Sequence, residues 1–314
     1  MYSLLIVGTL PKTAGFGGVA VHVERLLSYL NKEGVEYTFS DYKKESFFSV
    51  LWKLSRAQVV HLHLSNAYIR LIFILWARIF HTTTIVTFHG NYKHIRNSWV
   101  KLAFKLADYP ITINSDSFST AIAINPKTRL YPAFIPPQAQ SILSDEIIEI
   151  LDSAKKKFGK VYSTNAYRYA IDADGNEIYG IPFLCDYFEK ADDGCLIVSD
   201  PSGEYKKRIL DKCERVIFID VPHDYFEILK RVDVFVRNTS TDGDSLSVRE
   251  ALYIGIPALC SDCVERPDGC TLFHYNDLHS FATACKTLKN EASKPHKMLD
   301  ATHYLSELYG DLFK

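Results

Sequence analysis

The chain has 314 residues, of which 47% are hydrophobic and 23% are charged. This mixture is too apolar for a disordered protein, and seven cysteines are too few for a disulfide scaffold of this length. A net charge of −1 excludes a generic polyanion binder. The length fits one large domain or two domains of about 150 residues.

The near-neutral total conceals an uneven distribution of charge. Residues 1–136 carry 15 Lys and Arg against 7 Asp and Glu, whereas the remainder carries 21 against 30. A basic front half and an acidic back half indicate two units that face different partners.

The sequence shows neither a targeting signal nor a membrane span. Met1–Leu10 lacks a basic region, and the most apolar window, Ile69–Phe80, contains two arginines and is shorter than the roughly 20 residues of a span. All seven cysteines follow residue 184, and Cys260 and Cys263 form a CxxC pair without a second pair. We therefore expect a cytoplasmic protein with reduced thiols.

Strand and helix patterns alternate through the first 135 residues. Short apolar runs predict strands, and helical spacing of apolar residues predicts helices. In chain order we expect strand Ser3–Leu10, helix Val19–Glu33, strand Val59–Leu64, helix Ala67–Phe80, strand Thr84–Phe88, helix Trp99–Asp108 and strand Pro110–Asn114. This alternation favours parallel strands in an open, doubly wound sheet.

Three prolines within Tyr131–Pro137 predict an extended linker, after which the alternation resumes. The expected elements are helix Asp145–Phe158, strand Lys160–Thr164, helix Pro182–Lys190, strand Cys195–Ser199, strand Arg215–Ile219, helix His223–Arg231, strand Val234–Arg237, helix Val248–Ile254, strand Pro257–Ser261 and helix Leu278–Asn290. We therefore predict an α/β protein of two Rossmann-like domains, 1–136 and 137–295. Such domains bind ligands in the cleft between them.

The most informative segment is the polar loop 238–245, between a strand and a helix. Backbone amides and partial positive charge at a helix start suit a phosphate or diphosphate. Ser247 lies three residues before Glu250, as in a capping box, so Glu250 can be interpreted as a helix cap. Asp242 and Asp244 can likewise be turn residues. Three acidic groups exceed what capping needs, and they favour a ribose or another polyhydroxyl ligand.

Asp242-x7-Glu250, followed by Ala-Leu-x-x-Gly-x-Pro, resembles the Glu-x7-Glu signature of retaining glycosyltransferases with the GT-B fold. The chain looks most like the family 4 enzymes of bacterial polysaccharide and glycolipid synthesis. Gly17-Gly18 before a helix, His61-Leu-His63 and Phe88-His89-Gly90 also match that pattern. The resemblance covers most of the chain and implies a C-terminal helix, within 296–314, that packs back on the first domain.

The resemblance assigns roles in binding a nucleotide-diphosphate sugar. Glu250 would bind the ribose hydroxyls, and the amides of Ser245, Leu246 and Ser247 would face the diphosphate. Asp242 stands where the family has its first Glu, and it would hold the transferred sugar near the reacting carbon.

The first domain would supply the acceptor side. His89 would lie near the acceptor and the anomeric centre. Gly17 and Gly18 would let the first helix start approach the donor phosphates closely.

One departure concerns the cations that neutralise the diphosphate in this family. Arg168 can serve as the expected arginine, but Tyr179 stands at the expected lysine position. Arg237 and Arg249 flank the donor loop and can supply the missing charge, or they can be ordinary solvated charges.

His61, His63 and His89 form a poor metal pattern, and strand-end histidines are more often hydrogen-bonded pocket residues. We predict no metal site, and the resemblance implies no cofactor and no obligatory metal. The basic first domain suits an anionic membrane surface and a glycan or lipid-linked acceptor, or it is a solvated face. No nucleic-acid-binding motif is visible.

The resemblance implies sugar transfer to an acceptor hydroxyl with retention of anomeric configuration, at the inner face of the membrane or in the cytoplasm. Two alternatives stay open. A related enzyme could epimerise or hydrolyse a nucleotide sugar. A degenerate, non-catalytic subunit could scaffold a polysaccharide assembly complex.

Overall fold

A computed structural model describes residues 2–14, 17–138, 140–172, 175–209, 214–288 and 300–313. The chain forms two compact units. The first consists of Met1–Ala139 with Leu299–Lys314, and the second of Gln140–Met298.

A parallel six-stranded sheet, in the order β2-β1-β3-β4-β5-β6, forms the centre of the first unit. Its strands are β1 (Tyr2–Gly8), β2 (Thr38–Asp41), β3 (Ala57–Leu62), β4 (Thr83–Phe88), β5 (Tyr109–Thr112) and β6 (Arg129–Leu130). Its helices are α1 (Pro11–Ala14), α2 (Gly18–Lys32), α3 (Phe47–Leu54), α4 (Ala67–Ile79), α5 (Ser98–Leu106), α6 (Ser115–Ile122) and α13 (Ala301–Leu312).

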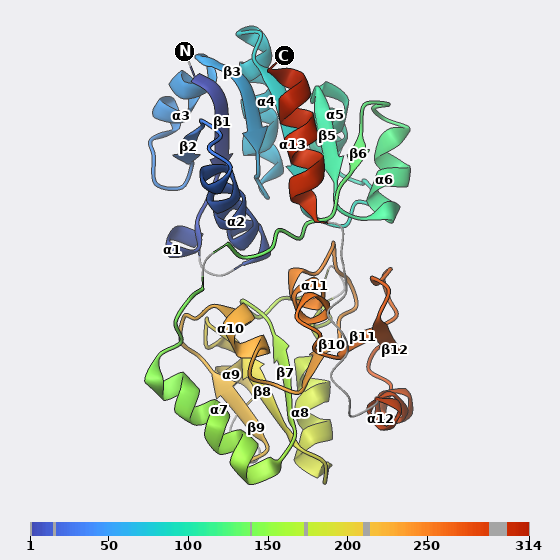
Figure 1. The fold of residues 1–314 in the computed structure, drawn as a ribbon. Coiled ribbons are helices and arrows are strands. Elements are labelled where there is room, and N and C mark those ends of the chain that lie inside the picture. Colours follow the sequence, from blue (N-terminus) through green and yellow to red (C-terminus); the bar gives the residue numbers. More distant parts are fainter. Residues whose placement is uncertain are drawn as a thin grey trace. The chain divides into compact units, whose positions relative to one another are not determined.

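Two apolar cores lie on opposite faces of this sheet. One is formed with α3, α4 and α5, and the other with α2 and α13. Figure 1 shows α13, the last helix of the chain, among the elements of the first unit. Leu305 and Leu308 of α13 are buried in the same core as Leu26 of α2.

The second unit has the same plan, with a parallel sheet in the order β12-β11-β10-β7-β8-β9. Its strands are β7 (Val161–Asn165), β8 (Cys195–Ser199), β9 (Val216–Ile219), β10 (Val234–Arg237), β11 (Ala258–Ser261) and β12 (Cys270–Phe273). Its helices are α7 (Asp145–Phe158), α8 (Ile181–Lys190), α9 (Glu204–Arg208), α10 (Tyr225–Leu229), α11 (Leu246–Tyr253) and α12 (Leu278–Thr287). Two apolar cores again pack against the sheet.

The structure confirms the predicted α/β class with two doubly wound sheets. In each sheet the strand order reverses once, between β1 and β3 in the first unit and between β7 and β10 in the second. Ligands of open α/β sheets bind outside the carboxyl ends of the strands at such a reversal. We therefore expect ligand-binding residues after the carboxyl ends of β1, β3, β7 and β10.

The segment 131–137 differs from the expected linker. Tyr131 and Ile135 are buried in a core of the first unit, and the Phe134 carbonyl accepts a hydrogen bond of 2.8 Å from the Ala301 amide. Apolar side chains between the prolines pack inward, so the unit boundary falls after residue 139 rather than 136. Residues 289 and 290 of the expected helix Leu278–Asn290, and most of the segment 296–300, lie outside the described residues.

None of the helices in the described ranges has the length and apolarity needed to cross a lipid bilayer. Six of the cysteines are described, and all six are free thiols, including Cys260 and Cys263.

Candidate functional site

The loop between β10 and α11 ends at a capped helix start. Ser245 is the N-cap of α11, and its side chain accepts from the amide of Val248 at 3.5 Å. The amides of Leu246 and Ser247 belong to the first turn, where a helix supplies no carbonyl partner. This end of α11 therefore suits an anion, as the sequence predicts.

The interpretation of Ser247 and Glu250 as a capping box is wrong. With Ser245 as N-cap, the third helical residue is Val248, so Ser247 and Glu250 do not occupy capping-box positions. Glu250 is instead a buried carboxylate within α11, 4% exposed. Burial raises the pKa of Tyr225, and the negative charge of Glu250 adds to that shift. Helix capping therefore does not explain Glu250.

Asp242 lies between two arginines. Its Oδ2 accepts from Arg237 Nε at 2.9 Å and from Arg266 Nη1 at 3.2 Å, and its Oδ1 accepts from Arg237 Nη2 at 3.4 Å. The side chains of Asp242, Arg237 and Arg266 are 13%, 10% and 3% exposed. Burial alone would raise the pKa of Asp242, but the two guanidinium groups outweigh burial and hold that pKa below its ordinary value. Asp242 is therefore ionised at neutral pH.

Arg237 occupies the strand reversal of the second sheet. It ends β10, and its Nη1 donates to the carbonyl of Asn165, the last residue of β7, at 3.0 Å. Its guanidinium lies 4.8 Å from the ring centroid of Tyr179, the residue at the expected lysine position. Arg237 therefore lies beside Tyr179, the residue that stands at the expected lysine position.

The other two candidate arginines lie in different surroundings. Arg249 Nε donates to both carboxylate oxygens of Asp244, at 2.5 and 2.7 Å, so its charge is already opposed. Arg168 is exposed in the loop that follows β7.

Tyr179 is followed by a tightly constrained turn. Gly180 has a φ of +55° and is the N-cap of α8. A Cβ on Gly180 would lie 2.1 Å from Asn238 Nδ2, which itself donates to the Gly180 carbonyl. This contact fixes the segment after Tyr179 against the start of the β10–α11 loop, so any larger residue would displace the loop.

In the first unit, Gly17 and Gly18 lie at a helix start, as predicted. Gly17 is the N-cap of α2, and it provides no side-chain cap. His61 lies within β3, His63 follows the end of β3, and His89 lies just beyond the neighbouring strand β4. His63 Nδ1 and His89 Nε2 are 3.0 Å apart.

His22 of α2 joins these strand-end histidines. Its ring centroid lies 5.1 Å from that of His63 and 4.8 Å from that of His89. His61 lies deeper, with Nδ1 2.6 Å from the Tyr309 hydroxyl and Nε2 2.7 Å from Thr87 Oγ1. Burial lowers the pKa of His22 to about 4 and holds the pKa of the other three well below the ordinary value. All four imidazoles are therefore neutral near pH 7.

Sequence reasoning missed two residues of these sites. Arg266 follows β11, which is adjacent to β10 only in the folded sheet. His22 comes from a helix, and helical spacing alone does not indicate which strand ends it faces. In both cases the missing information was the strand order.

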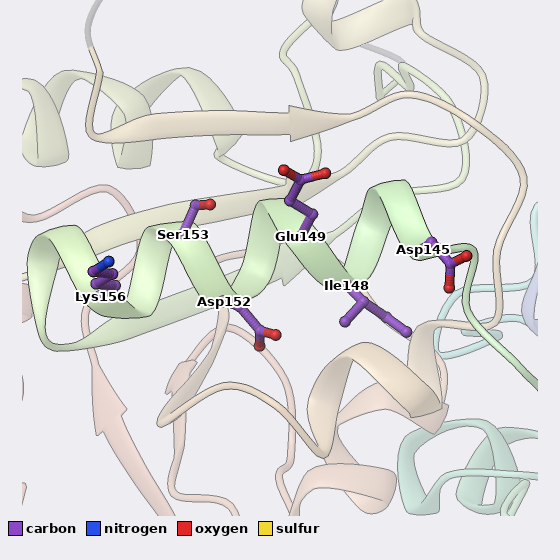
Figure 2. Close-up of a pocket in the computed structure, with 6 residues that line it drawn as sticks. All are labelled: Asp145, Ile148, Glu149, Asp152, Ser153 and Lys156. Carbon is purple, nitrogen blue, oxygen red and sulfur yellow. The ribbon is translucent and has the colours of Figure 1, made fainter.

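A shallow recess on the surface of α7 does not bring together polar side chains from several elements, as the two sites above do. Figure 2 shows its six lining side chains along one helix, with Glu149 and Asp152 projecting in opposite directions. We therefore assign no function to this recess.

No family model matches the chain, and no curated protein matches it closely enough to count as a relative. Solved structures do match over the whole length. HepE from Anabaena in complex with UDP and glucose has a TM-score of 0.71 at 11% identity, and the match covers 100% of both chains. Sucrose-phosphate synthase from Thermosynechococcus elongatus has a TM-score of 0.69 at 14% identity, over 100% of this chain and 99% of that one.

The chain has the GT-B fold. The lipopolysaccharide outer core galactosyltransferase WaaB also matches, with a TM-score of 0.58 at 14% identity over 98% of this chain and 99% of that one. At these identities the likeness to GT-B proteins establishes the fold alone.

Proposed function

We propose that the protein is a retaining glycosyltransferase that moves a sugar from a nucleoside diphosphate to an acceptor hydroxyl. The observation that carries this proposal is the β10–α11 connection. It combines the first-turn amides of α11, the Arg237 guanidinium held by the Asn165 carbonyl, and the buried Glu250 carboxylate, which is not a helix cap. These groups match the diphosphate and the ribose of such a donor. The GT-B proteins of similar structure include HepE, which was crystallised with UDP-glucose.

The donor binds to the second unit in this proposal. The first-turn amides of Leu246 and Ser247 receive the diphosphate, with Ser245 fixing the helix start. Arg237 takes the place of the lysine that Tyr179 replaces, and Arg168 and Arg249 are secondary candidates. Glu250 accepts hydrogen bonds from the two ribose hydroxyls, because one carboxylate can accept from two vicinal donors.

Asp242 is proposed to hold the transferred sugar. A carboxylate has about four acceptor positions, and the arginines occupy three of those on Asp242. One position on Oδ1 therefore remains for a sugar hydroxyl. The same contacts make Asp242 a positioning residue for Arg237, since they hold the guanidinium at the carboxyl end of β10.

The first unit binds the acceptor in this proposal. His89 is half-buried beside the strand reversal and is neutral, so it can hydrogen-bond an acceptor hydroxyl. Gly17 and Gly18 leave the start of α2 open to a phosphate. The leaving phosphate oxygen takes the acceptor proton on the same face of the sugar, so retention needs neither a dedicated carboxylate base nor a metal ion at the donor.

The acceptor is proposed to be a glycan or glycolipid at an anionic membrane surface. Exposed apolar residues on α4 recur at helical spacing, namely Tyr68, Ile72, Leu75 and Ile79, and Phe48 and Trp52 of α3 and Trp99 of α5 are exposed as well. Residues 46–107 contain eight Lys and Arg and no Asp or Glu. Apolar side chains with one sign of charge complement an anionic lipid headgroup layer. The protein would then act at the cytoplasmic side of that membrane, in surface polysaccharide or glycolipid synthesis.

Saturation-transfer NMR against a panel of nucleotide sugars, beginning with UDP-glucose, tests the donor site directly. Glu250→Gln should weaken binding by roughly 10- to 100-fold, because it removes a charged acceptor of two hydrogen bonds. Glu149→Gln, an exposed carboxamide substitution on α7, should leave binding unchanged. Equal affinity in wild type and Glu250→Gln would refute the ribose assignment.

Product analysis separates the remaining candidates. A transferase yields a product with the donor's anomeric configuration only when an acceptor is present. An epimerase or a hydrolase changes the nucleotide sugar without any acceptor. Binding without turnover in every acceptor mixture would favour a non-catalytic scaffold subunit. Tyr179 and Asp242, which stand in place of the family's lysine and glutamate, are the residues that motivate this alternative.

A further inference from the structure

Three histidines of the first unit converge on one point from three elements. His22 comes from α2, His63 follows β3 and His89 follows β4. Each offers a ring nitrogen, and these nitrogens all lie within 4.8 Å of one another. The strand reversal of the sheet brings these elements together, and the sequence pattern of His61, His63 and His89 does not identify this set.

The tautomer of His22 is fixed by its backbone partner. His22 Nδ1 lies 2.7 Å from the Ala133 carbonyl, which can only accept, so Nδ1 carries the proton and Nε2 carries a lone pair. Nε2 is buried and has no hydrogen-bond partner among the described residues, and the same holds for His63 Nε2. A metal-binding histidine typically donates its other N–H to a backbone carbonyl in this way.

The spacing of the second pair also fits ligation. His63 Nδ1 and His89 Nε2 are 3.0 Å apart, and two nitrogens on one tetrahedral zinc ion lie roughly 3.3 Å apart. Two imidazole nitrogens at this distance share either a proton or a metal ion. His22 Nε2 favours an ion, because it is a buried lone pair without a hydrogen-bond partner among the described residues, and such a group costs free energy. With Nδ1 as the ligand atom of His63, its Nε2 would carry the proton.

We propose that His22, His63 and His89 form a binding site for a divalent transition-metal ion of the zinc class. Three neutral imidazoles with a fourth position open are a ligand set that Zn²⁺, Co²⁺ and Ni²⁺ accept. His61 does not ligate, since Tyr309 and Thr87 already engage both of its nitrogens. Among the described residues this group includes no carboxylate, and the positive charges of Arg25 and Arg70 act on His22 and His89. We therefore expect micromolar rather than nanomolar affinity.

The site is independent of the proposed transferase activity. A bound ion would occupy His89, so it would inhibit transfer rather than assist it. Metal binding can therefore be measured directly, whether or not the transferase assignment is correct.

Titration calorimetry with Zn²⁺ and visible absorption with Co²⁺ on the chelator-treated full chain test the proposal. A Cys263→Ser background removes the thiol that is exposed among the described cysteines. We expect saturable binding of about one ion per chain, with the absorption bands of four- or five-coordinate Co²⁺. His22→Asn keeps an N–H toward the Ala133 carbonyl but removes the ligand nitrogen, and it should lower the affinity by roughly 100-fold or more.

His94→Ala, which removes an exposed histidine of the same unit, is the matched control and should bind like the parent. His63→Gln provides a second ligand deletion, and circular dichroism verifies that each variant is folded. Absence of saturable binding in the parent protein, or binding that His22→Asn and His63→Gln leave unchanged, would overturn the proposal.

Discussion

At the scale of single residues, the Asp242 contacts decide how the donor site is built. The Asp242 carboxylate pairs with two nearly buried guanidinium groups, Arg237 from β10 and Arg266 from the segment after β11. Removing one partner of a buried ion pair costs far more than the pair contributes, because the remaining charges lose their compensation. Asp242 therefore links the stability of the second unit to its proposed chemistry.

Asp242→Asn should destabilise the second unit by about 3 kcal/mol, because two buried arginines lose their counter-charge. Urea unfolding followed by far-ultraviolet circular dichroism measures this loss. The control is Asp220→Asn, which breaks the exposed pair with Lys206 and should cost less than about 1 kcal/mol. Equal losses in the two variants would show that the arginines do not depend on Asp242.

The depressed pKa of Asp242 also predicts a pH dependence. An unfolded aspartate has a pKa of about 3.9, and the folded value is lower. The Asp242 contribution is therefore fully present well above pH 4, and it is lost as the pH falls through the folded pKa. The difference in unfolding free energy between wild type and Asp242→Asn should be constant from pH 7 to 5 and shrink below about pH 4. A difference that is independent of pH would contradict this linkage.

At the scale of elements, the sequence predicts the long helices and inner strands well. Asp145–Phe158, Cys195–Ser199 and Val234–Arg237 have the predicted bounds, because their apolar periodicity and flanking turn residues agree. Several short elements were not predicted. The edge strands β2 and β12 are less buried than the equally short β10, so they lack its continuous apolar run, and the five residues of α9 are too few for a helical period.

The candidate site was only partly predictable for a related reason. Two serines precede Glu250 at plausible capping positions, and sequence spacing favours Ser247. The helix begins two residues earlier because Ser245 is the residue with extended backbone that caps Val248. Both serines are chemically suited to cap a helix, so the sequence alone does not distinguish the two starts.

Ser245→Ala should destabilise the second unit by about 1 kcal/mol and also weaken nucleotide binding, because the first-turn amides of α11 lose their fixed geometry. Ser144→Ala removes the equivalent cap of α7 in the same unit. It should cost a similar amount of stability without changing nucleotide affinity. Denaturant unfolding measures the stability of each variant, and calorimetric titration measures its nucleotide affinity. If Ser245→Ala and Ser144→Ala changed the affinity equally, a role for the start of α11 would be refuted.

The exposed face of α4 makes a separate prediction. Ile72 and Ile79 are 43% and 66% exposed, so Ile72→Ser with Ile79→Ser should preserve the fold. If these side chains enter a bilayer, the double variant should bind anionic vesicles about tenfold more weakly, as judged by cosedimentation. Serine at Leu272 and Leu278, which are similarly exposed in the second unit, should have no effect. Binding that is equally strong to zwitterionic vesicles would contradict the charge argument.

At the scale of the whole molecule, α13 ties the end of the chain to the first unit. The Tyr309 hydroxyl lies 2.6 Å from His61 Nδ1, within the core that α13 shares with α2. The sequence resemblance suggested a returning helix. The hydrogen bond to a buried histidine of β3 could not be predicted without the fold.

Tyr309→Phe should lower the stability of the first unit by about 1–3 kcal/mol, because a buried ring nitrogen of His61 loses its partner. All three tryptophans, Trp52, Trp76 and Trp99, belong to this unit, so their fluorescence reports its unfolding selectively. Tyr304→Phe keeps the ring stacked on Tyr131 and should change stability by less than about 0.5 kcal/mol. Similar losses in the two variants would show that the His61 contact is unimportant.

The route of the chain through the two units has a consequence for synthesis on the ribosome. The second unit is one continuous stretch, 140–298, whereas the first is interrupted and ends with residues 299–314. Domains fold as units while the chain emerges. The first unit therefore cannot complete its fold until α13 has left the exit tunnel. The second unit can fold before α13 emerges. A nascent chain stalled just short of α13 should accordingly contain a protease-resistant second unit and a protease-sensitive first one.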